Sequence, residues 1–322
     1  MSSKFRLTAL LSGVALLSQA CHPLVLPAED RTAIKKDEVP AILTDFDSYP
    51  ANPVFVGSQV GNWDARIRER GWILKERGVY ALWYTGYDGT KVGSKHLGLA
   101  TSTDGIHWQR HPSNPLVPES WVEDVCVQKR ANTYYMFAEG VGDQAHLLTS
   151  KDWVHWEEQG TLSILKTDGT PIEPGPFGTP TAWYENDTWY LFYERRDLGV
   201  WLATSTDARV WKNKSDDPVM LPGPAEYDRE LIAFNQIVKN GDRYFVLYHG
   251  SNGETTPSLW TTCIAYSDDL LHWKKWAGNP ITRDTANKSS GILVPDGDKF
   301  RLYTMHEQVQ LHFPKLPLPV QK

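Results

Sequence analysis

Apolar and aromatic residues recur in this chain as short strand-like segments at a nearly constant spacing. Five such segments occupy residues 80–84, 134–138, 189–193, 244–248 and 300–304, and their centres lie 54, 55, 55 and 56 residues apart. Self-similarity at a fixed period indicates one supersecondary unit that is repeated around an axis or along a line. The hydrophobic pattern therefore predicts a repeat protein.

Further strand-like segments flank each aromatic segment, and polar turn residues separate them. A third segment follows in four repeats, at residues 97–101, 146–149, 200–204 and 262–266. The same four repeats continue with the pattern S-x-D-x-x-x-W, as in Ser102, Asp104 and Trp108. An Asp side chain can accept bonds from backbone N–H groups two residues on and so hold a turn; we expect the Trp to cover the next blade. Four short strands per repeat are typical of a β-propeller blade.

The ends of the chain predict how the ring closes. A dipeptide ending in Pro follows six residues after Trp108, Trp211 and Trp273, and Asn52-Pro53 stands six residues after Phe46. The fifth repeat has no S-x-D-x-x-x-W, so residues 41–54 are expected to supply its outer strand. The sequence predicts an all-β fold in residues 41–322: a five-bladed β-propeller with four-stranded antiparallel blades and no long exposed edge.

The first residues read as an export signal. Lys4 and Arg6 precede an apolar run over residues 7–17, and Ser18-Gln19-Ala20 provides a small-residue cleavage context. Cys21 follows directly and resembles the lipid-attachment cysteine of bacterial lipoproteins. We expect residues 1–21 to be a signal peptide and residues 22–40 a tether. The chain is then exported, either anchored in the cell envelope or secreted, and a lipid anchor would be its contact with the membrane.

The composition of the 322-residue chain limits which classes of partner it can bind. A formal net charge of −6 gives no nucleic-acid footprint, and the 14 Trp residues suit a large aromatic core. Cys126 and Cys263 lie in apolar strands of non-adjacent repeats, which favours buried free thiols over a disulfide. No zinc-type spacing or cofactor motif occurs, although a structural divalent cation in the central channel stays open.

Candidate site residues recur at fixed places on the inner strands. Eighteen residues before the centre of an aromatic strand stand Asp64, Glu173 and Asp228, while Asp124 stands twelve before it, next to Glu123. Each could be a turn or cap residue repeated for structural reasons. Because inner strands converge on the channel, their joint placement instead favours a site at its entrance.

Basic residues suggest what that site binds. Arg66, Arg68 and Arg70 share one face of the first inner strand at a period of two, and Lys288 could extend the patch. Facing the channel, they would favour a carboxylate- or sulfate-bearing plant or algal glycan. Solvated arginines, or arginines paired with Glu123 and Glu69, are the alternative.

Three stretches carry a family resemblance: Trp63-Asp64, residues 80–84 and residues 99–108. They resemble the five-bladed glycoside hydrolases of families 43, 32 and 117 and the related mannoside phosphorylases. The resemblance implies Asp64 as base or nucleophile and Asp124 as a carboxylate that tunes a neighbour's pKa. Families 43 and 32 place a Glu where this chain has Thr179, so Glu173 or Asp228 is expected to be the general acid.

Two further residues join the site through the same resemblance. His306 would be the partner of a later-blade carboxylate, as in family 117, and Trp63 would contact the sugar. The expected function is hydrolysis of a glycosidic bond in an oligosaccharide by paired carboxylates. A non-catalytic carbohydrate-binding propeller and a glycoside phosphorylase of the same fold are the alternatives.

Overall fold

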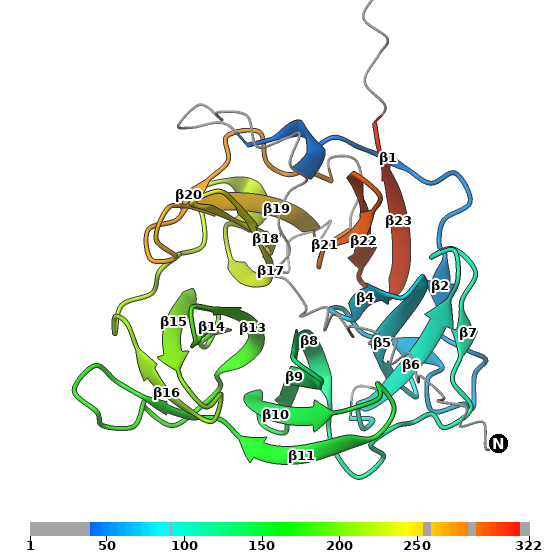
Figure 1. Ribbon diagram of the computed structural model, residues 1–322, viewed down its shortest axis with the longest axis horizontal. Coiled ribbons are helices and arrows are strands. Elements are labelled where there is room, and N and C mark those ends of the chain that lie inside the picture. Colours follow the sequence, from blue (N-terminus) through cyan, green and yellow to red (C-terminus); the bar gives the residue numbers. More distant parts are fainter. Residues whose placement is uncertain (1–38, 91, 254–258, 283–287, 316–322) are drawn as a thin grey trace, which may run out of the picture.

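The computed structural model describes residues 39–90, 92–253, 259–282 and 288–315. Five small sheets stand around one axis like the blades of a propeller (Figure 1). Helical structure among these residues is limited to two 3-10 turns, η2 (Ala41–Leu43) and η3 (Glu226–Asp228). None of it is long and apolar enough for a membrane span. Cys21 and the proposed signal peptide lie outside the described residues.

Each blade runs from an inner strand at the axis to an outer strand at the rim. Blade 1 contains β3 (Arg66–Ile67), β4 (Trp72–Glu76), β5 (Val79–Tyr87), β6 (His96–Ser102) and β7 (Gln109–Arg110). Blade 2 contains β8 (Glu123–Arg130), β9 (Thr133–Gly140), β10 (Gln144–Ser150) and β11 (Trp156–Thr161). Neighbouring strands pair antiparallel in both blades.

The remaining blades repeat this plan with additions. Blade 3 contains β13 (Gly178–Glu185), β14 (Thr188–Glu194), β15 (Val200–Ser205) and β16 (Val210–Asn213). A fifth strand, β12 (Ser163–Leu165), pairs parallel with β16, which the sequence did not predict. Blade 4 contains β17 (Leu231–Asn240), β18 (Arg243–Ser251), β19 (Trp260–Ser267) and β20 (Lys274–Lys275).

Blade 5 confirms the predicted closure. It contains β21 (Ile292–Asp296), β22 (Lys299–Met305), β23 (Gln308–Pro314), β1 (Phe46–Ser48) and β2 (Phe55–Val56), the last two both pairing with β23. The Asn52 side chain accepts the N–H of Leu311 at 2.8 Å and donates to its carbonyl at 2.7 Å. Asn114 brackets Leu99 in blade 1 in the same way. The N-terminal segment thus completes blade 5 as a native outer strand would.

The S-x-D-x-x-x-W segments form the predicted turns. In blade 1, Asp104 Oδ1 accepts the backbone N–H groups of Ile106 and His107, and Ser102 Oγ donates to the same oxygen. The prediction that the Trp covers the next blade is wrong. Trp108 packs edge-on against Tyr303 of blade 5, the preceding blade, because the turn reaches back over that blade's second strand.

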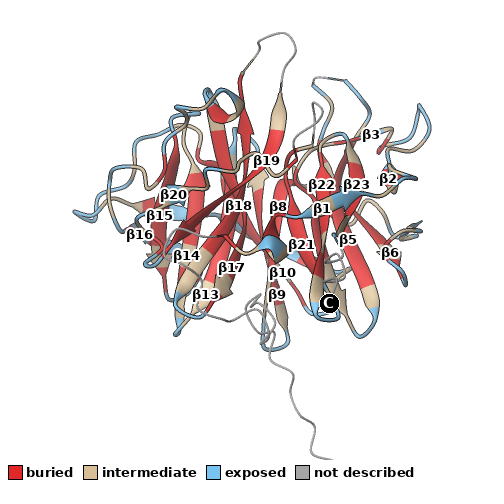
Figure 2. Ribbon diagram, turned by 90° about the horizontal axis from the view of Figure 1, so that it is seen from above, coloured by how far each residue is buried: buried red, intermediate tan, exposed pale blue. Residues whose placement is uncertain are grey.

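The Trp residues of the other turns point in the same direction. Trp156 packs against Trp83 of blade 1, and Trp211 packs against Phe137 of blade 2. These edge-to-face contacts stabilise each pair beyond its area burial. Figure 2 shows that buried residues fill the strands and exposed residues the loops. Cys126 and Cys263 are buried free thiols in that core, as predicted.

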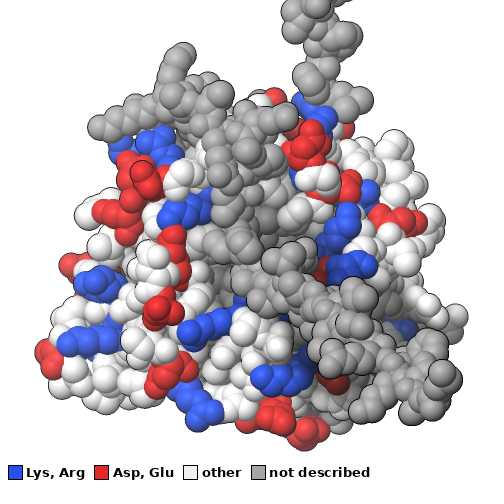
Figure 3. All heavy atoms as spheres, in the orientation of Figure 1, with Lys and Arg blue, Asp and Glu red and all other residues white. Residues whose placement is uncertain are grey.

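The surface carries mixed charge. On the face seen in Figure 3, acidic and basic side chains are interspersed rather than gathered into a field of one sign. Many are paired, as Arg301 is with Asp296 at 2.7 Å.

The turns should make the fold sensitive to acid. Asp152 accepts the N–H of His155 at 2.9 Å and contacts its ring, and these bonds lower the pKa of Asp152 to about 2. A depressed carboxyl pKa stabilises the fold above the ordinary value and loses that effect as the pH falls from about 4 towards 2. We expect Asp152→Asn to remove about 1 kcal/mol at pH 7, a fall in Tm of about 2 °C.

Thermal melts from pH 7 to pH 2.5 check this. The difference between wild type and Asp152→Asn should shrink below pH 4, while the exposed Asp298→Asn serves as a control that leaves Tm unchanged. A difference that is constant with pH would contradict the role of the Asp152 charge.

Candidate active site

A cavity of about 220 Å³ opens at the axis, where inner strands begin and second strands end. Blades 1 to 4 all contribute to this cavity, which we call the axial pocket. Its lining comprises Arg68, Glu69, Glu123, Asp124, Glu139, Asp143, Pro176, Thr179, Glu194, Arg196, Asp197, Leu231, Ala233, His249 and Trp260.

A repeated backbone feature shapes its floor. Arg70, Asp124, Thr179 and Ser290 all stand twelve residues before the centre of an aromatic strand, and their φ angles are 54°, 52°, 49° and 56°. The ladder shifts at these places in blades 2 and 3. Such bulges re-aim a side chain, and left-handed backbone costs free energy in residues other than glycine. Four blades therefore hold the same strained conformation beside the axis.

Asp124 and Glu139 form the central carboxyl pair of the pocket. Asp124 is buried, and its Oδ1 has no hydrogen-bond partner among the described residues. Burial and the nearby charge of Glu139 raise the pKa of Asp124 well above its ordinary value. Burial, followed by Glu123, raises the pKa of Glu139 to about 7. The backbone N–H of Thr179 donates to Glu139 Oε2 at 2.9 Å and opposes that shift.

A second carboxyl pair stands on blade 3. Burial and the charge of Asp197 raise the pKa of Glu194 to about 8. Burial and Asp143 raise the pKa of Asp197. Raised pKa values therefore favour the protonated form of several carboxyl groups of the pocket near neutral pH.

Aromatic rings form the wall at blade 4 and continue behind it into blade 5. Trp260 lies 5.7 Å from the ring of His249 and 5.2 Å from that of His306, centroid to centroid. Burial, with the charge of Arg70, lowers the pKa of His249 to about 3, so this imidazole is neutral. His306 is not among the lining residues, but it lies behind Trp260 and contacts Ser289 at 3.1 Å.

The arginines of the first inner strand have different surroundings. Arg68 is bonded to Glu123 and Glu69 at 2.7 and 2.9 Å, which is the alternative left open above. Arg70 is buried beneath the pocket, and Arg66 is exposed. Neither Arg66 nor Arg70 lines the cavity, so the expected anion-binding patch is not formed.

Asp64 lies outside the axial pocket. Its carboxylate accepts hydrogen bonds from Ser58 at 2.5 Å, Tyr84 at 2.9 Å and Arg110 at 2.7 Å. Burial alone would raise the pKa of Asp64, but these donors outweigh it and hold the pKa below its ordinary value. A carboxylate saturated in this way links β5 to β7 within its blade. Trp63 stacks on Tyr84 beside it.

Asp228 makes the same kind of link in blade 4. It is fully buried and contacts Tyr248 at 3.0 Å and Lys275 at 2.6 Å. Glu173 is exposed on a loop, where it pairs with Lys166 at 3.4 Å. Neither carboxylate reaches the axial pocket, so the expected convergence of Asp64, Glu173 and Asp228 is wrong. Asp64 and Asp228 recur at the same spacing because each links strands within its own blade.

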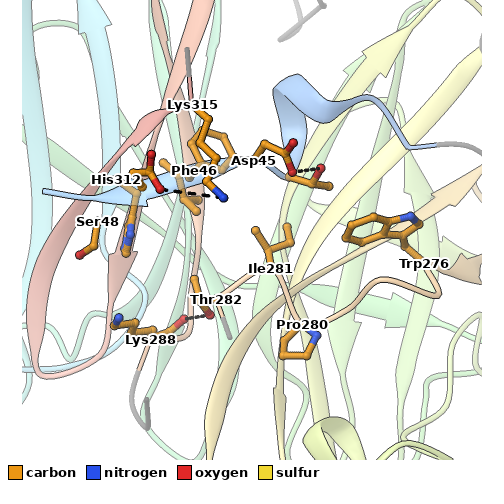
Figure 4. Close-up of a pocket in the computed structure, with 13 residues that line it drawn as sticks. Asp45, Phe46, Ser48, Trp276, Pro280, Ile281, Thr282, Lys288, His312 and Lys315 are labelled. Atoms are coloured by element: carbon orange, nitrogen blue, oxygen red, sulfur yellow. Dashed lines mark hydrogen bonds and ion pairs between the residues drawn. The ribbon is translucent and has the colours of Figure 1, made fainter. Parts of the chain in front are cut away.

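Lys288 lines a different cavity, of about 370 Å³, between blades 4 and 5 (Figure 4). Its walls include Trp276 from the side of β20 and Asp45 and Ser48 from the closing segment. Figure 4 shows Lys288 beside Thr282, whose hydroxyl donates to the Lys288 carbonyl at 3.1 Å. The structure does not bring Lys288 to the axial pocket.

No metal centre is evident among the residues that the structure describes. Within the described ranges, no group of three or more His, Cys, Asp or Glu side chains is arranged to hold a metal ion.

Sequence comparisons find catalytic relatives. The chain is 23% identical over 233 residues to a 1,2-β-oligomannan phosphorylase from Thermoanaerobacter sp. (strain X514), covering 67% of this chain and 75% of that enzyme. It is 30% identical over 186 residues to sucrose-6-phosphate hydrolase from Escherichia coli, covering 50% of this chain but 37% of that enzyme. No family model matches.

Solved structures match more of the chain. A glycosyl hydrolase from Bacteroides ovatus superposes with a TM-score of 0.67 at 16% identity, covering 88% of this chain and 97% of the other. The β-1,2-mannobiose phosphorylase from Listeria innocua, in complex with β-1,2-mannobiose, superposes with a TM-score of 0.64 at 16% identity, covering 84% and 96%. The chain has the fold of the five-bladed glycoside hydrolases and phosphorylases.

The sequence contains a repeat signal for several pocket residues that were not predicted. Glu139, Glu194 and His249 each stand three residues after the centre of an aromatic strand. That position lies near the end of the second strand, beside the start of the inner strand. Aligning the repeats there as well would have found them, whereas Trp260 has no equivalent signal.

Stability should separate the structural aspartate from the pocket aspartate. Asp64→Asn removes the charge that Arg110 contacts, and we expect a loss of about 1–3 kcal/mol, several degrees in Tm. Asp124 has a raised pKa, so its ionised form destabilises the fold above pH 4. Asp124→Asn should keep or raise Tm at pH 8. Melts of both variants at pH 8 check this; a large loss for Asp124→Asn would contradict it.

Proposed function

We propose that the chain is a glycoside hydrolase whose catalytic pair is Asp124 and Glu139. The observation that carries this is the Asp124 carboxyl group, buried in the pocket with an unpartnered oxygen beside a second carboxyl group. Glycosidic cleavage needs one carboxyl group that is protonated and one that is ionised. Two interacting carboxyl groups that hold one proton between them meet this need.

The surroundings assign the two roles. Glu139 accepts the backbone N–H of Thr179, which stabilises its ionised form. Asp124 has no such donor at Oδ1 and lies deeper, which favours its neutral form. Asp124 is therefore the proton donor to the leaving oxygen, and Glu139 is the base that activates water. This proposed role differs from the one implied by the family resemblance, in which Asp124 tunes the pKa of a neighbour.

The charge of the pocket favours water over phosphate as the acceptor. Among its described lining residues are seven carboxyl groups and two guanidinium groups. Arg68 is engaged by Glu69 and Glu123, and Arg196 donates to the Pro174 carbonyl at 2.5 Å. A phosphate ion would enter a site of its own sign. The similarity to mannoside phosphorylases keeps phosphorolysis as the second candidate.

The same charge favours a neutral sugar over an acidic or sulfated glycan. Trp260 offers an aromatic surface, and the carboxyl groups offer acceptors for hydroxyls. A cavity of about 220 Å³ is smaller than the roughly 300–1,000 Å³ of drug-sized sites. It suits a terminal sugar unit of an oligosaccharide.

Turnover assays test the proposal. Neutral oligosaccharides, including β-1,2-mannobiose and fructans, are offered with and without inorganic phosphate, beside uronate-containing and sulfated ones. We expect phosphate-independent hydrolysis of a neutral substrate. Asp124→Asn should lower kcat by about 10²–10⁴-fold, and Asp64→Asn at a temperature below its Tm should retain turnover.

Other outcomes name the alternatives. Turnover that requires phosphate and releases a sugar phosphate would identify a phosphorylase. Sugar binding without turnover of any substrate would identify a carbohydrate-binding propeller. Full activity of Asp124→Asn would overturn the assignment of the acid.

A further inference from the structure

Arg70 is an unusual residue to find at the centre of a propeller. It is 2% exposed and has a left-handed backbone, with φ of 54°. Burying a guanidinium group costs several kcal/mol unless partners compensate it. Because Arg70 does not line the axial pocket, direct contact with a sugar does not explain it.

The contacts of Arg70 join its own blade to three others. Its N–H donates to the Met305 carbonyl of blade 5 at 3.2 Å, and its carbonyl accepts the N–H of Val125 in blade 2 at 3.0 Å. Its Nη2 donates to the Pro180 carbonyl and to Thr181 Oγ1 of blade 3, both at 2.8 Å.

Blade 4 is joined indirectly. The Thr181 hydroxyl that accepts from Arg70 donates in turn to the Phe234 carbonyl at 2.6 Å. Arg70 therefore lies where all five blades meet.

This network holds the bulge that carries Asp124. Val125, which donates to Arg70, directly follows Asp124 in β8. Arg70 Nη1 and Asp124 Oδ1 are both buried and both without a hydrogen-bond partner in the described part of the chain. One atom is a cationic donor and the other a carboxyl acceptor, and the charges of the two residues interact although they form no ion pair within 4 Å. The leftover atoms point to a function rather than to packing alone.

We propose that Arg70 is a positioning residue for Asp124, fixing the pocket floor and the carboxyl orientation from beneath through contacts across the blades. This inference rests on the proposed function of Asp124 as the acid. Arg70 touches neither the sugar nor the reacting atoms. It acts through the backbone at Val125 and through its charge.

The positive charge of Arg70 shifts the pKa of Asp124 in a definite direction. Asp124 is faced by Glu139 from β9, by Glu123 from β8, and by Glu69 and Arg70 from blade 1. The three glutamates raise its pKa, and Arg70 opposes them. Arg68 of blade 1 is a second cation whose charge interacts with Asp124, but it is ion-paired with Glu69 and Glu123. His249, which also faces Arg70, is neutral. Removing the Arg70 charge must therefore raise the pKa of Asp124 further.

Two substitutions separate geometry from charge. Arg70→Lys keeps the cation but loses the planar fork that reaches two acceptors. Arg70→Gln keeps a donor but loses the cation. We expect both to lower kcat by about 10²-fold with KM changed less than about threefold, since Arg70 lies outside the sugar cavity. Only Arg70→Gln should move the basic limb of the kcat profile to higher pH.

Arg110→Gln is the matched control. Arg110 is an ion-paired arginine of the same blade that bonds Asp64 outside the pocket. Its loss should lower Tm without moving the pH limb. If Arg70→Gln lowers Tm and leaves both kcat and the basic limb unchanged, Arg70 is structural only and the proposal is overturned.

A measurement without substrate keeps this test independent of the proposed function. The infrared band of the protonated Asp124 carboxyl is followed during a pH titration and assigned by its loss in Asp124→Asn. An upward shift of its midpoint in Arg70→Gln supports the proposal, and an unchanged midpoint overturns it. Absence of any wild-type turnover, with the shift present, would count against the hydrolase and not against the coupling of Arg70 to Asp124.

Discussion

Closure of the ring is the constraint on which the rest of this structure depends. A three-residue strand, Phe46–Ser48, pairs with β23 across more than 250 residues of chain. With that pairing, every blade has a neighbour on both sides, and the Trp residues of the turns in blades 1 to 4 pack onto the preceding blade. The starts of the inner strands are then held at one axis, where carboxyl groups from different blades meet.

Repetition of the backbone with variation of the side chain creates the site. The left-handed backbone conformation recurs in four blades, but it carries Arg70, Asp124, Thr179 and Ser290 in turn. One backbone conformation thus presents a cation, an acid and two hydroxyl groups near the axis. By contrast, Asp64 and Asp228 repeat both position and partner type, a Tyr and a cation, and serve the blades themselves.

Burying carboxyl groups close to one another in the pocket destabilises the folded state, and other interactions must offset this free energy. Burial and mutual repulsion raise the pKa of Glu139 to about 7 and that of Glu194 to about 8. Protonated carboxyl groups at neutral pH are what acid catalysis requires, and they destabilise the fold when they ionise. The aromatic interfaces between blades supply the rigidity that keeps such groups together.

The sequence by itself determined the architecture. The spacing of the aromatic strands, the S-x-D-x-x-x-W turns and Asn52-Pro53 are local signals, because a strand and its turn are set by neighbouring residues. The number of blades, the closing segment and the two buried thiols followed from them. The fifth strand of blade 3 did not, since parallel pairing with β16 carries no local pattern.

The site was decided by the tertiary structure. Asp64, Glu173 and Asp228 recur at the same place in their repeats, which suggested a shared function. In the structure, Asp64 bonds Tyr84 and Arg110 within its blade, and Asp228 bonds Lys275 within its own. Glu173 lies on a solvent-exposed loop. The sequence identified Asp124 because the comparison was made along the inner strands, one of which carries it. It missed Glu139 and Glu194 because these residues reach the axis from the second strands. Burial and the charges of other blades set their pKa values, and these depend on distances that only the closed ring creates.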